Sequence, residues 1–249
     1  LRIDEFSVDL VSKVQEVRKS SLTFAPEAGT QRMRDVINKN LTEEEIISGC
    51  KLAFEGGWNR VKLYFMTGLP TETDEDIEGI AKLGEKIVET FYNIPKEKRQ
   101  NTVKIVLSTA CFVPKPFTPF QWHGQATSEE FMDKHNFLRK RITRRQIQFN
   151  HHDAQTSLIE AVIARGDRKV ANAIYAAYKN GCTFDSWTEH FRFEDWLKSF
   201  EEASIDPGFY AYRDRDYDEI FPWDHISVGV SKEFLIRESK KALESQTTP

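Results

Sequence analysis

The stretch SLTFAPEAGTQRMRD (residues 21–35) gives the first indication of the fold, because a strand, a turn and a helix are predicted to follow one another within it. The β-favouring residues 21–25 predict a short strand. Pro26 ends this run, the carboxylate of Glu27 follows, and a helical pattern begins after Gly29 and Thr30. Parallel sheets carry their chemistry where strands end and helices begin. Glu27 is therefore a candidate functional residue if the chain repeats this unit.

The chain does repeat the unit. Further strands are predicted at residues 60–66, 102–110 and 145–151. The four predicted strand ends, near residues 25, 66, 110 and 151, follow one another at a step of 41 to 44 residues. Helical patterns that begin with a threonine and an acid three residues later fill the gaps at residues 42–57, 73–92 and 127–142. Another helix is predicted before the first strand, at residues 7–18.

The regular alternation of strand and helix predicts an α/β protein with a parallel sheet, as a barrel or an open sheet. The strands are near-continuous apolar runs, which predicts burial of both their faces. After residue 153 the pattern becomes mostly helical, so we expect a sheet domain over residues 1–153 and a helical extension over residues 154–249 packed on it. An eight-stranded barrel takes roughly 250 residues, and four strands use about 150 here, so we expect further units upstream.

The composition limits the classes of protein. The 249 residues include 35 basic and 39 acidic ones, and the net charge of −4 excludes a surface that is basic overall. Three single, widely spaced cysteines (Cys50, Cys111 and Cys182) favour a reducing compartment and predict a cytoplasmic protein. No CxxC or CxxxCxxC spacing occurs, so we expect no metal ligands in this chain. No apolar run approaches about 18 residues, which argues against a transmembrane helix.

Three motifs follow the first three predicted strands, at residues 26–30, 66–76 and 108–122. The carboxylate of Glu27 can accept hydrogen bonds from an ammonium, ribose hydroxyls or backbone amides, or it can simply pair with Arg32. Gly29 allows a sharp turn or close approach to a ligand. Gly68 and Pro70 turn the chain at the end of the strand. Gly68 either leaves its backbone groups open to a flat ligand such as adenine, or Gly68 and Pro70 form an ordinary loop. The acids at residues 72–76 are assigned to the positive end of the next helix.

The remaining motifs leave alternatives open. The proline- and aromatic-rich residues 108–122 either roof a cavity or close one end of a hydrophobic core. His151, His152 and Asp153 end the fourth predicted strand, where an acid–base role competes with structural hydrogen bonds. The basic run Arg139, Lys140, Arg141, Arg144 and Arg145 is either a solvated face or an RNA or phosphate contact. The segment ARGDR (residues 164–168) predicts an ion pair between helices.

Three segments together resemble the later strands of a radical S-adenosylmethionine enzyme: LTFAPEAGTQRMRDVINK, VKLYFMTGLPTETDED and ACFVPKPFTPFQW. The chain is most similar to an uncharacterised bacterial subfamily of fused, B12-binding-like radical S-adenosylmethionine proteins. The resemblance implies a partial TIM-type (β/α) barrel with a mostly helical C-terminal extension. It also implies two cofactors, S-adenosylmethionine and a 4Fe–4S cluster held by a CxxxCxxC loop. This chain lacks that loop, so we expect the cluster ligands in an upstream half of the same protein and no turnover by this part alone.

The resemblance assigns cofactor contacts to nine positions: Glu27, Gly29, Lys39, Tyr64, Gly68, Leu69, Pro70, Phe112 and Val113. Lys39 lies where several relatives have an arginine that binds the carboxylate of S-adenosylmethionine. Tyr64 lies where some relatives have an aspartate for the ribose. Phe112 and Val113 are expected to contact adenine. The resemblance assigns no catalytic residue.

The sequence thus predicts part of a radical S-adenosylmethionine enzyme that modifies an unidentified substrate, with RNA and protein as the suggested classes. Two alternatives remain. One is a barrel enzyme without radical chemistry that uses His152, Asp153 and Glu27 as acid–base groups. The other is a non-catalytic module that binds RNA or a protein through residues 139–145.

Overall fold

The computed structural model describes residues 21–244, so the helix predicted at residues 7–18 lies outside the described part. The described chain forms two compact units. The first unit comprises residues 21–110, 133–152 and 241–244, and the second comprises residues 111–132 and 153–240. The sequence predicts one division after residue 153, whereas in the structure residues 111–132 also belong to the second unit.

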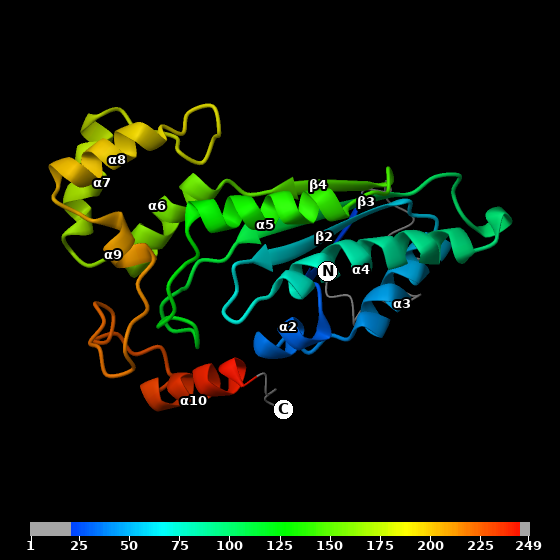
Figure 1. Ribbon diagram of the computed structural model, residues 1–249, viewed down its shortest axis with the longest axis horizontal. Coiled ribbons are helices and arrows are strands. Elements are labelled where there is room, and N and C mark those ends of the chain that lie inside the picture. The colour runs from blue at the N-terminus through cyan, green and yellow to red at the C-terminus, as the bar shows by residue number, and fades with distance from the viewer. Residues whose placement is uncertain (1–20, 245–249) are drawn as a thin grey trace. The chain divides into compact units, whose positions relative to one another are not determined.

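The first unit is built on a four-stranded sheet with the order β1-β2-β3-β4 (Figure 1). The strands are β1 (Leu22–Glu27), β2 (Arg60–Thr67), β3 (Lys104–Cys111) and β4 (Ile147–His151). Each pairs with its neighbour in sequence, and the β1–β2 and β3–β4 ladders are parallel. This confirms the α/β class and the four predicted strands, and the arrangement agrees with a partial TIM-type barrel.

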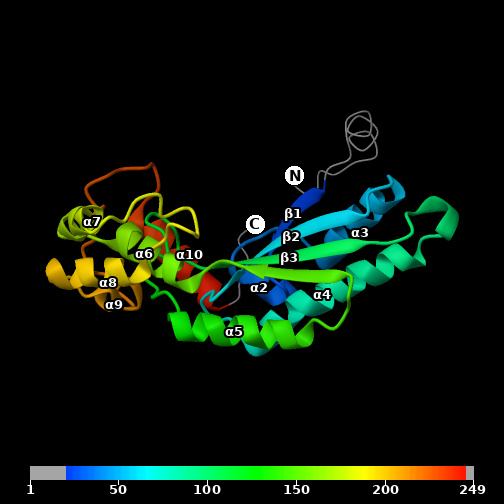
Figure 2. The same ribbon diagram turned by 90° about the horizontal axis from the view of Figure 1, so that it is seen from above.

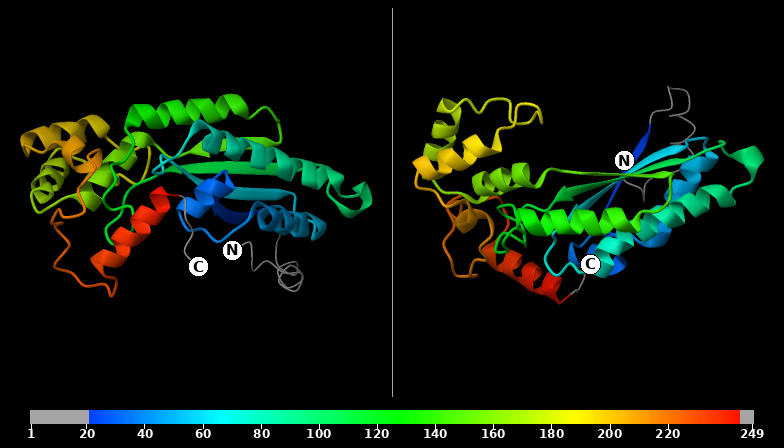
Figure 3. Two further views of the ribbon diagram at one scale, coloured as in Figure 1. Left: turned by 60° about the horizontal axis from the view of Figure 1, so that its bottom comes forward. Right: turned by 45° about the horizontal axis from the view of Figure 1, so that its top comes forward.

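Helices connect the strands: α2 (Gln31–Val36), α3 (Glu43–Glu55), α4 (Asp74–Asn93), the short 3₁₀ helix η1 (Lys96–Lys98) and α5 (Ser128–Arg141). The capping pairs predicted from sequence are formed. In α3, the amide of Thr42 donates to the carboxylate of Glu45, and the amide of Glu45 donates to the hydroxyl of Thr42. Helices α4 and α5 run along one face of the sheet (Figures 2 and 3). Helix α3 packs beside α4 through the rings of Phe54 and Phe91, whose centroids lie 5.2 Å apart.

The two faces of the sheet differ in exposure. On β2, Val61, Leu63 and Phe65 are buried under the helices, and the residues between them are half-buried. Strand β1 shows the same alternation. The prediction that both faces are buried is therefore wrong for these two strands. Apolar residues such as Met66 on the second face made the strand sequences look continuous, although α4 and α5 cover only the first face.

A pair of histidines lies on the helix-covered side of the sheet. His135 of α5 is 3% exposed and its ring stacks on that of His151, with 4.3 Å between centroids. Its Nε2 lies 3.4 Å from the hydroxyl of Thr67. Burial, with smaller contributions from His151 and Arg139, lowers the pKa of His135 to about 4. His135 is therefore neutral in the folded protein at neutral pH.

We expect this histidine to make the first unit sensitive to mild acid. Because the pKa of His135 is lower in the folded than in the unfolded chain, the unfolded chain binds the proton first. The contribution of neutral His135 to the free energy of unfolding is then complete above about pH 6.5, and it decreases as the pH falls toward 4. The loss approaches about 3 kcal/mol, and His135→Gln should remove that part of the pH dependence. Urea unfolding of both proteins at pH 7 and pH 4.5 checks this, and equal pH slopes would contradict it.

The second unit is mostly helical, as predicted. It contains α6 (Ala154–Arg165), α7 (Val170–Lys179), α8 (Phe193–Glu202), α9 (Pro207–Ala211) and most of α10 (Lys232–Leu243). One buried cluster joins α6 to α9, and a second gathers the aromatic residues Trp122, Phe221 and Trp223. Trp122 comes from the proline-rich segment, so that segment contributes to the core of this unit. The result favours the core-closing alternative for Trp122.

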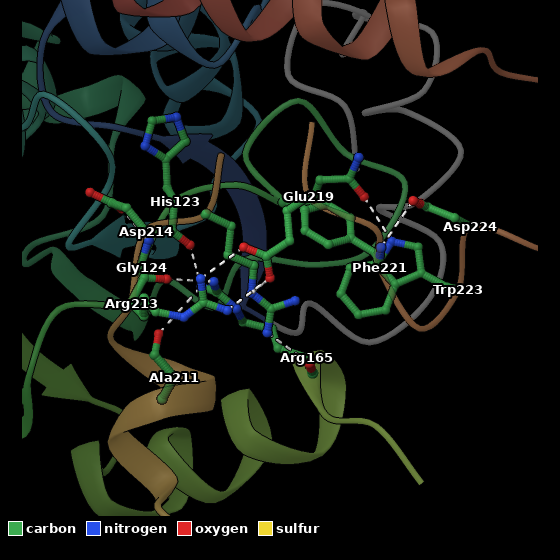
Figure 4. Close-up of polar contacts among 12 residues, drawn as sticks. His123, Gly124, Arg165, Ala211, Arg213, Asp214, Glu219, Phe221, Trp223 and Asp224 are labelled. Atoms are coloured by element: carbon green, nitrogen blue, oxygen red, sulfur yellow. Dashed lines mark hydrogen bonds and ion pairs between the residues drawn. The ribbon is translucent and has the colours of Figure 1, made fainter. Parts of the chain in front are cut away.

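A buried arginine holds the loops of the second unit together (Figure 4). Arg165, at the end of α6, is 1% exposed and donates hydrogen bonds to the carbonyls of His123, Ala211 and Arg213. Arg213 in turn forms a two-pronged ion pair with Glu219, with both N–O distances 2.8 Å. The ion pair between helices predicted for residues 164–168 is therefore wrong for Arg165. Its guanidinium binds carbonyl oxygens because these loops offer buried acceptors.

Candidate functional site

The carboxyl end of β1 holds Glu27 in an uncommon backbone conformation. The register between β1 and β2 shifts between Phe24 and Glu27, and the φ angle of Glu27 is +69°. A residue with a side chain seldom adopts this left-handed region, and such strain is concentrated at functional sites. The side chain of Glu27 is 28% exposed, so its carboxylate is accessible from solvent.

Glu27 pairs with Lys39. Their Oε1 and Nζ atoms lie 3.6 Å apart, and the lysine side chain is 37% exposed. The structure thus brings together two residues that the resemblance assigns to one cofactor. The alternative that Glu27 pairs with Arg32 is wrong, because Arg32 forms its ion pair with Asp76 of α4.

The end of helix α2 places Lys39 beside Glu27. Asn38 takes a left-handed conformation with φ of +51°, and its amide bonds to the carbonyl of Asp35 at 2.9 Å. The amide of Lys39 bonds to the carbonyl of Arg34 at 2.7 Å. These two bonds form a Schellman motif, which ends the helix and turns the chain back. The turn sets the direction from which the lysine reaches the end of β1.

Gly29 is packed against helix α4. A Cβ atom on Gly29 would lie 2.4 Å from the amide nitrogen of Ile80 and 2.5 Å from the carbonyl oxygen of Asp76. The absence of a side chain is thus explained by this contact. A cofactor contact through the backbone of Gly29 stays a prediction.

Asp76 joins α4 to the loop after β1. Its side chain is 4% exposed and accepts hydrogen bonds from Thr30 and Arg32, and also from the amide of Thr73 at 2.9 Å. Burial alone would raise the pKa of Asp76, but the hydrogen bonds from Arg32, Thr30 and Thr73 outweigh it and lower that pKa. The carboxylate therefore stays charged and fixes the start of α2 against α4.

The turn after β2 is closed by Glu72. Gly68 is left-handed, with φ of +81°, and its amide donates to Glu72 Oε2 at 2.8 Å. Lys134 of α5 lies 3.1 Å from the same oxygen. Burial raises the pKa of Glu72, against the opposing effects of Lys134 and the Gly68 amide. The assignment of this acid to the next helix alone is therefore wrong, and the amide of Gly68 is already bonded within the chain.

The other predicted contacts of the first unit lie on β2 or in its turn. Leu69 is buried, whereas Pro70 is half-buried. Tyr64 lies on the half-exposed face of β2, with Lys62 Nζ 4.5 Å from its ring centroid. A role for Tyr64 at the ribose stays a prediction.

Phe112 and Val113 belong to the second unit. Val113 is 7% exposed and forms part of the core that joins α6 to α9. The carbonyl of Phe112 accepts a hydrogen bond from Gln125 at 3.2 Å, and its ring meets that of Phe120 edge-on. Both residues thus have packing roles within this unit, and their contact with adenine stays a prediction.

Three residues of the two alternative functions, Asp153, Arg141 and Arg144, make structural contacts. Asp153 accepts a hydrogen bond from the amide of Thr156 at 2.8 Å and caps α6. In the basic run, Arg144 pairs with Glu89 at 2.8 Å and Arg141 with Glu78 at 3.4 Å. These contacts favour the structural interpretations of both motifs.

The cysteines give no sign of metal binding. All three are free and buried, and burial raises the pKa of Cys50 to about 12 and that of Cys111 to about 11. Among residues 21–244, no three His, Cys, Asp or Glu side chains are grouped closely enough to hold a metal ion. In that same part of the chain, no helix combines the length and apolarity that crossing a membrane requires.

Residues 2–84 match the model of the radical SAM superfamily. The match includes β1, α2, α3 and β2, and therefore Glu27, Lys39 and the turn closed by Glu72. It supports an enzyme of this superfamily, whose members in general use S-adenosylmethionine and a 4Fe–4S cluster.

A protein of Methanocaldococcus jannaschii, named only as uncharacterized, is 32% identical over 207 residues. The aligned part covers 82% of this chain but 43% of that protein, so the chain spans less than half of this relative. The superfamily resemblance is thus confirmed for residues 2–84. The fused subfamily and the bacterial origin stay predictions.

Proposed function

We propose that this chain is the S-adenosylmethionine-binding C-terminal part of a radical S-adenosylmethionine enzyme. The proposal rests on the pair formed by Glu27 and Lys39 at the end of β1. The amino-acid end of S-adenosylmethionine carries an ammonium and a carboxylate, so it needs one acceptor and one cation close together. Glu27 and Lys39 offer these groups 3.6 Å apart, and both are partly exposed.

Three parts of the chain have roles in this proposal. Glu27 accepts from the ammonium, and Lys39 binds the carboxylate. The turn at Gly68, Leu69 and Pro70 contacts the adenine, and Glu72 fixes the shape of this turn through the hydrogen bond that it accepts from the Gly68 amide. The protein's contribution is to orient the cofactor and keep water away, since the reactive chemistry belongs to the cofactor.

The residues of this chain do not fit the iron–sulfur cluster. Its three cysteines are buried, and none of them lies in a CxxxCxxC spacing. We assign the cluster ligands to an upstream half of the same protein, which is therefore the first partner of this chain. A cluster of this kind supplies the one-electron reductive cleavage of S-adenosylmethionine. A cytoplasmic location and an RNA or protein substrate complete the proposal.

The decisive experiment uses the full-length protein, reconstituted anaerobically with iron and sulfide and then reduced. We expect it to convert S-adenosylmethionine to 5′-deoxyadenosine, which chromatography with mass detection measures. A protein with a fully loaded cluster that yields no 5′-deoxyadenosine would overturn the proposal. If 5′-deoxyadenosine is formed, analysis of cell RNA and protein after the reaction identifies the substrate.

Glu27→Gln tests the pair of Glu27 and Lys39 on which the proposal rests. The substitution keeps the size of the side chain but removes its charge, so the affinity for S-adenosylmethionine should fall about tenfold or more. Equilibrium dialysis with the full-length protein measures this, and circular dichroism checks the fold.

The matched control is Glu78→Gln, which removes the same charge from a partly exposed carboxylate that pairs with Lys82 and Arg141. That variant should bind like the unmodified protein. An unchanged affinity in folded Glu27→Gln would return Glu27 to a purely structural role.

A further inference from the structure

A buried arginine contacts the residue after Glu27 and the amide of Lys39. Arg34 of α2 is 0% exposed. Its Nη1 donates to the carbonyl of Ala28 at 3.1 Å, and its Nη2 donates to Gln31 Oε1 at 3.2 Å. Ala28 directly follows the left-handed Glu27, so this hydrogen bond restrains the Ala28–Gly29 peptide, one peptide beyond the two that flank the glutamate.

The backbone of the same residue holds the other member of the pair. The carbonyl of Arg34 accepts the hydrogen bond from the amide of Lys39 at 2.7 Å. Arg34 therefore contacts the residue after Glu27 through its side chain and the amide of Lys39 through its backbone. Its position in α2 is fixed by its own amide, which donates to the carbonyl of Thr30 at 3.1 Å.

From this geometry we infer that Arg34 is a positioning residue that sets the separation of Glu27 and Lys39 for the bound amino-acid end of S-adenosylmethionine. The inference rests on the proposed function for its ligand. It assigns to Arg34 no contact with the cofactor, because the guanidinium is fully buried and Ala28 and Gln31 are its acceptors.

A buried cation at this place needs a reason. Its surroundings are acidic, since Glu43, Asp35 and Glu44 all act electrostatically on it, yet its donors go to a carbonyl and an amide oxygen. The Nε of Arg34 has no hydrogen-bond partner among the described residues. A shorter apolar side chain would avoid that unpaired donor but would leave the carbonyl of Ala28 without its hydrogen bond. The contact with Ala28 is therefore one that an arginine makes here and a shorter apolar side chain cannot make.

The separation of the pair can be measured without any cofactor. A zero-length carbodiimide cross-linker joins a carboxylate to an amine only when the two lie in contact, and Glu27 and Lys39 are both accessible. Mass spectrometry of the digested full-length protein gives the yield of the Glu27–Lys39 link. We expect Arg34→Met to lower this yield at least threefold. Arg34→Lys, which keeps a single cationic donor, should give an intermediate yield and serves if the methionine variant does not fold.

The matched control is Arg99→Met. Arg99 also donates to backbone carbonyls, those of Ile94 at 3.0 Å and Gln100 at 3.1 Å, but it precedes β3 at the opposite end of the strands. The cross-link yield of this variant should equal that of the unmodified protein. An unchanged yield in folded Arg34→Met would overturn the inference.

A double-mutant cycle then connects the positioning to the cofactor. Arg34→Met should weaken S-adenosylmethionine binding about tenfold when Glu27 is present and less than twofold in the Glu27→Gln background. Equal effects in both backgrounds would show that Arg34 does not act through Glu27 and would overturn the inference. An unmodified protein that binds no S-adenosylmethionine, with a cross-link that still depends on Arg34, would instead overturn the proposed function.

Discussion

Arg165→Met should lower the free energy of unfolding of the second unit by about 3–5 kcal/mol. The guanidinium of Arg165 is almost completely buried and supplies three backbone carbonyls with hydrogen bonds. Methionine fills most of the same volume but donates nothing, so these buried acceptors lose their donors. Urea unfolding followed by tryptophan fluorescence suits this test, because four of the five tryptophans lie in the second unit.

Arg192→Met is the matched control for this prediction. The side chain of Arg192 is 52% exposed, and it pairs with Asp195 at 2.6 Å on the surface of the same unit. Its carbonyl contacts, to Asn180 and Gly181, are long at 3.4 Å. Its replacement should cost less than about 1 kcal/mol. If the two variants lose the same stability, burial of the Arg165 network is not what stabilises these loops.

Gly29→Ala should destabilise the first unit by about 3 kcal/mol or more. The added Cβ would lie within 2.7 Å of three backbone atoms of α4, and backbone cannot move away as a flexible side chain can. Helix α4 or the loop after β1 must therefore shift. Thermal unfolding followed by circular dichroism should show a midpoint lower by roughly 10 °C.

Gly84→Ala on the same helix is the comparison. Its Cβ would meet only side-chain atoms, the nearest being Leu107 Cδ1 at 3.1 Å, and alanine favours the helix over glycine. The two effects oppose each other, so the net change should be smaller than about 1 kcal/mol. A Gly29→Ala protein that unfolds at the same temperature as Gly84→Ala would contradict the close packing of this loop on α4.

The sheet could be predicted from the sequence because its signals are local. Each strand is a short β-favouring run, and the three helices predicted between the strands begin with a threonine and an acid three residues later. Connections of this length favour the parallel pairing of successive strands. The exposure of each face could not be predicted, because it depends on where the helices pack. Tyr64 and Phe65 are neighbours of similar size, yet they face opposite sides of the sheet.

The candidate site was predicted in part. The position of Glu27 follows from the end of a strand, and Lys39 from the resemblance. Their pairing could not be predicted, since it depends on the left-handed turn at Asn38 that returns the chain toward β1. Arg34 was missed because a charged residue in a short helix is normally exposed. The link between Lys134 and Glu72 was missed because it joins residues 62 positions apart.

The left-handed backbone of Glu27 has a consequence for engineering. Glycine adopts this conformation at little cost, whereas a glutamate stores strain in it of order 1–3 kcal/mol. A library screened only for resistance to heat should therefore enrich glycine at position 27. The resulting proteins would tolerate higher temperatures and lack the carboxylate, so such a campaign has to keep this codon fixed.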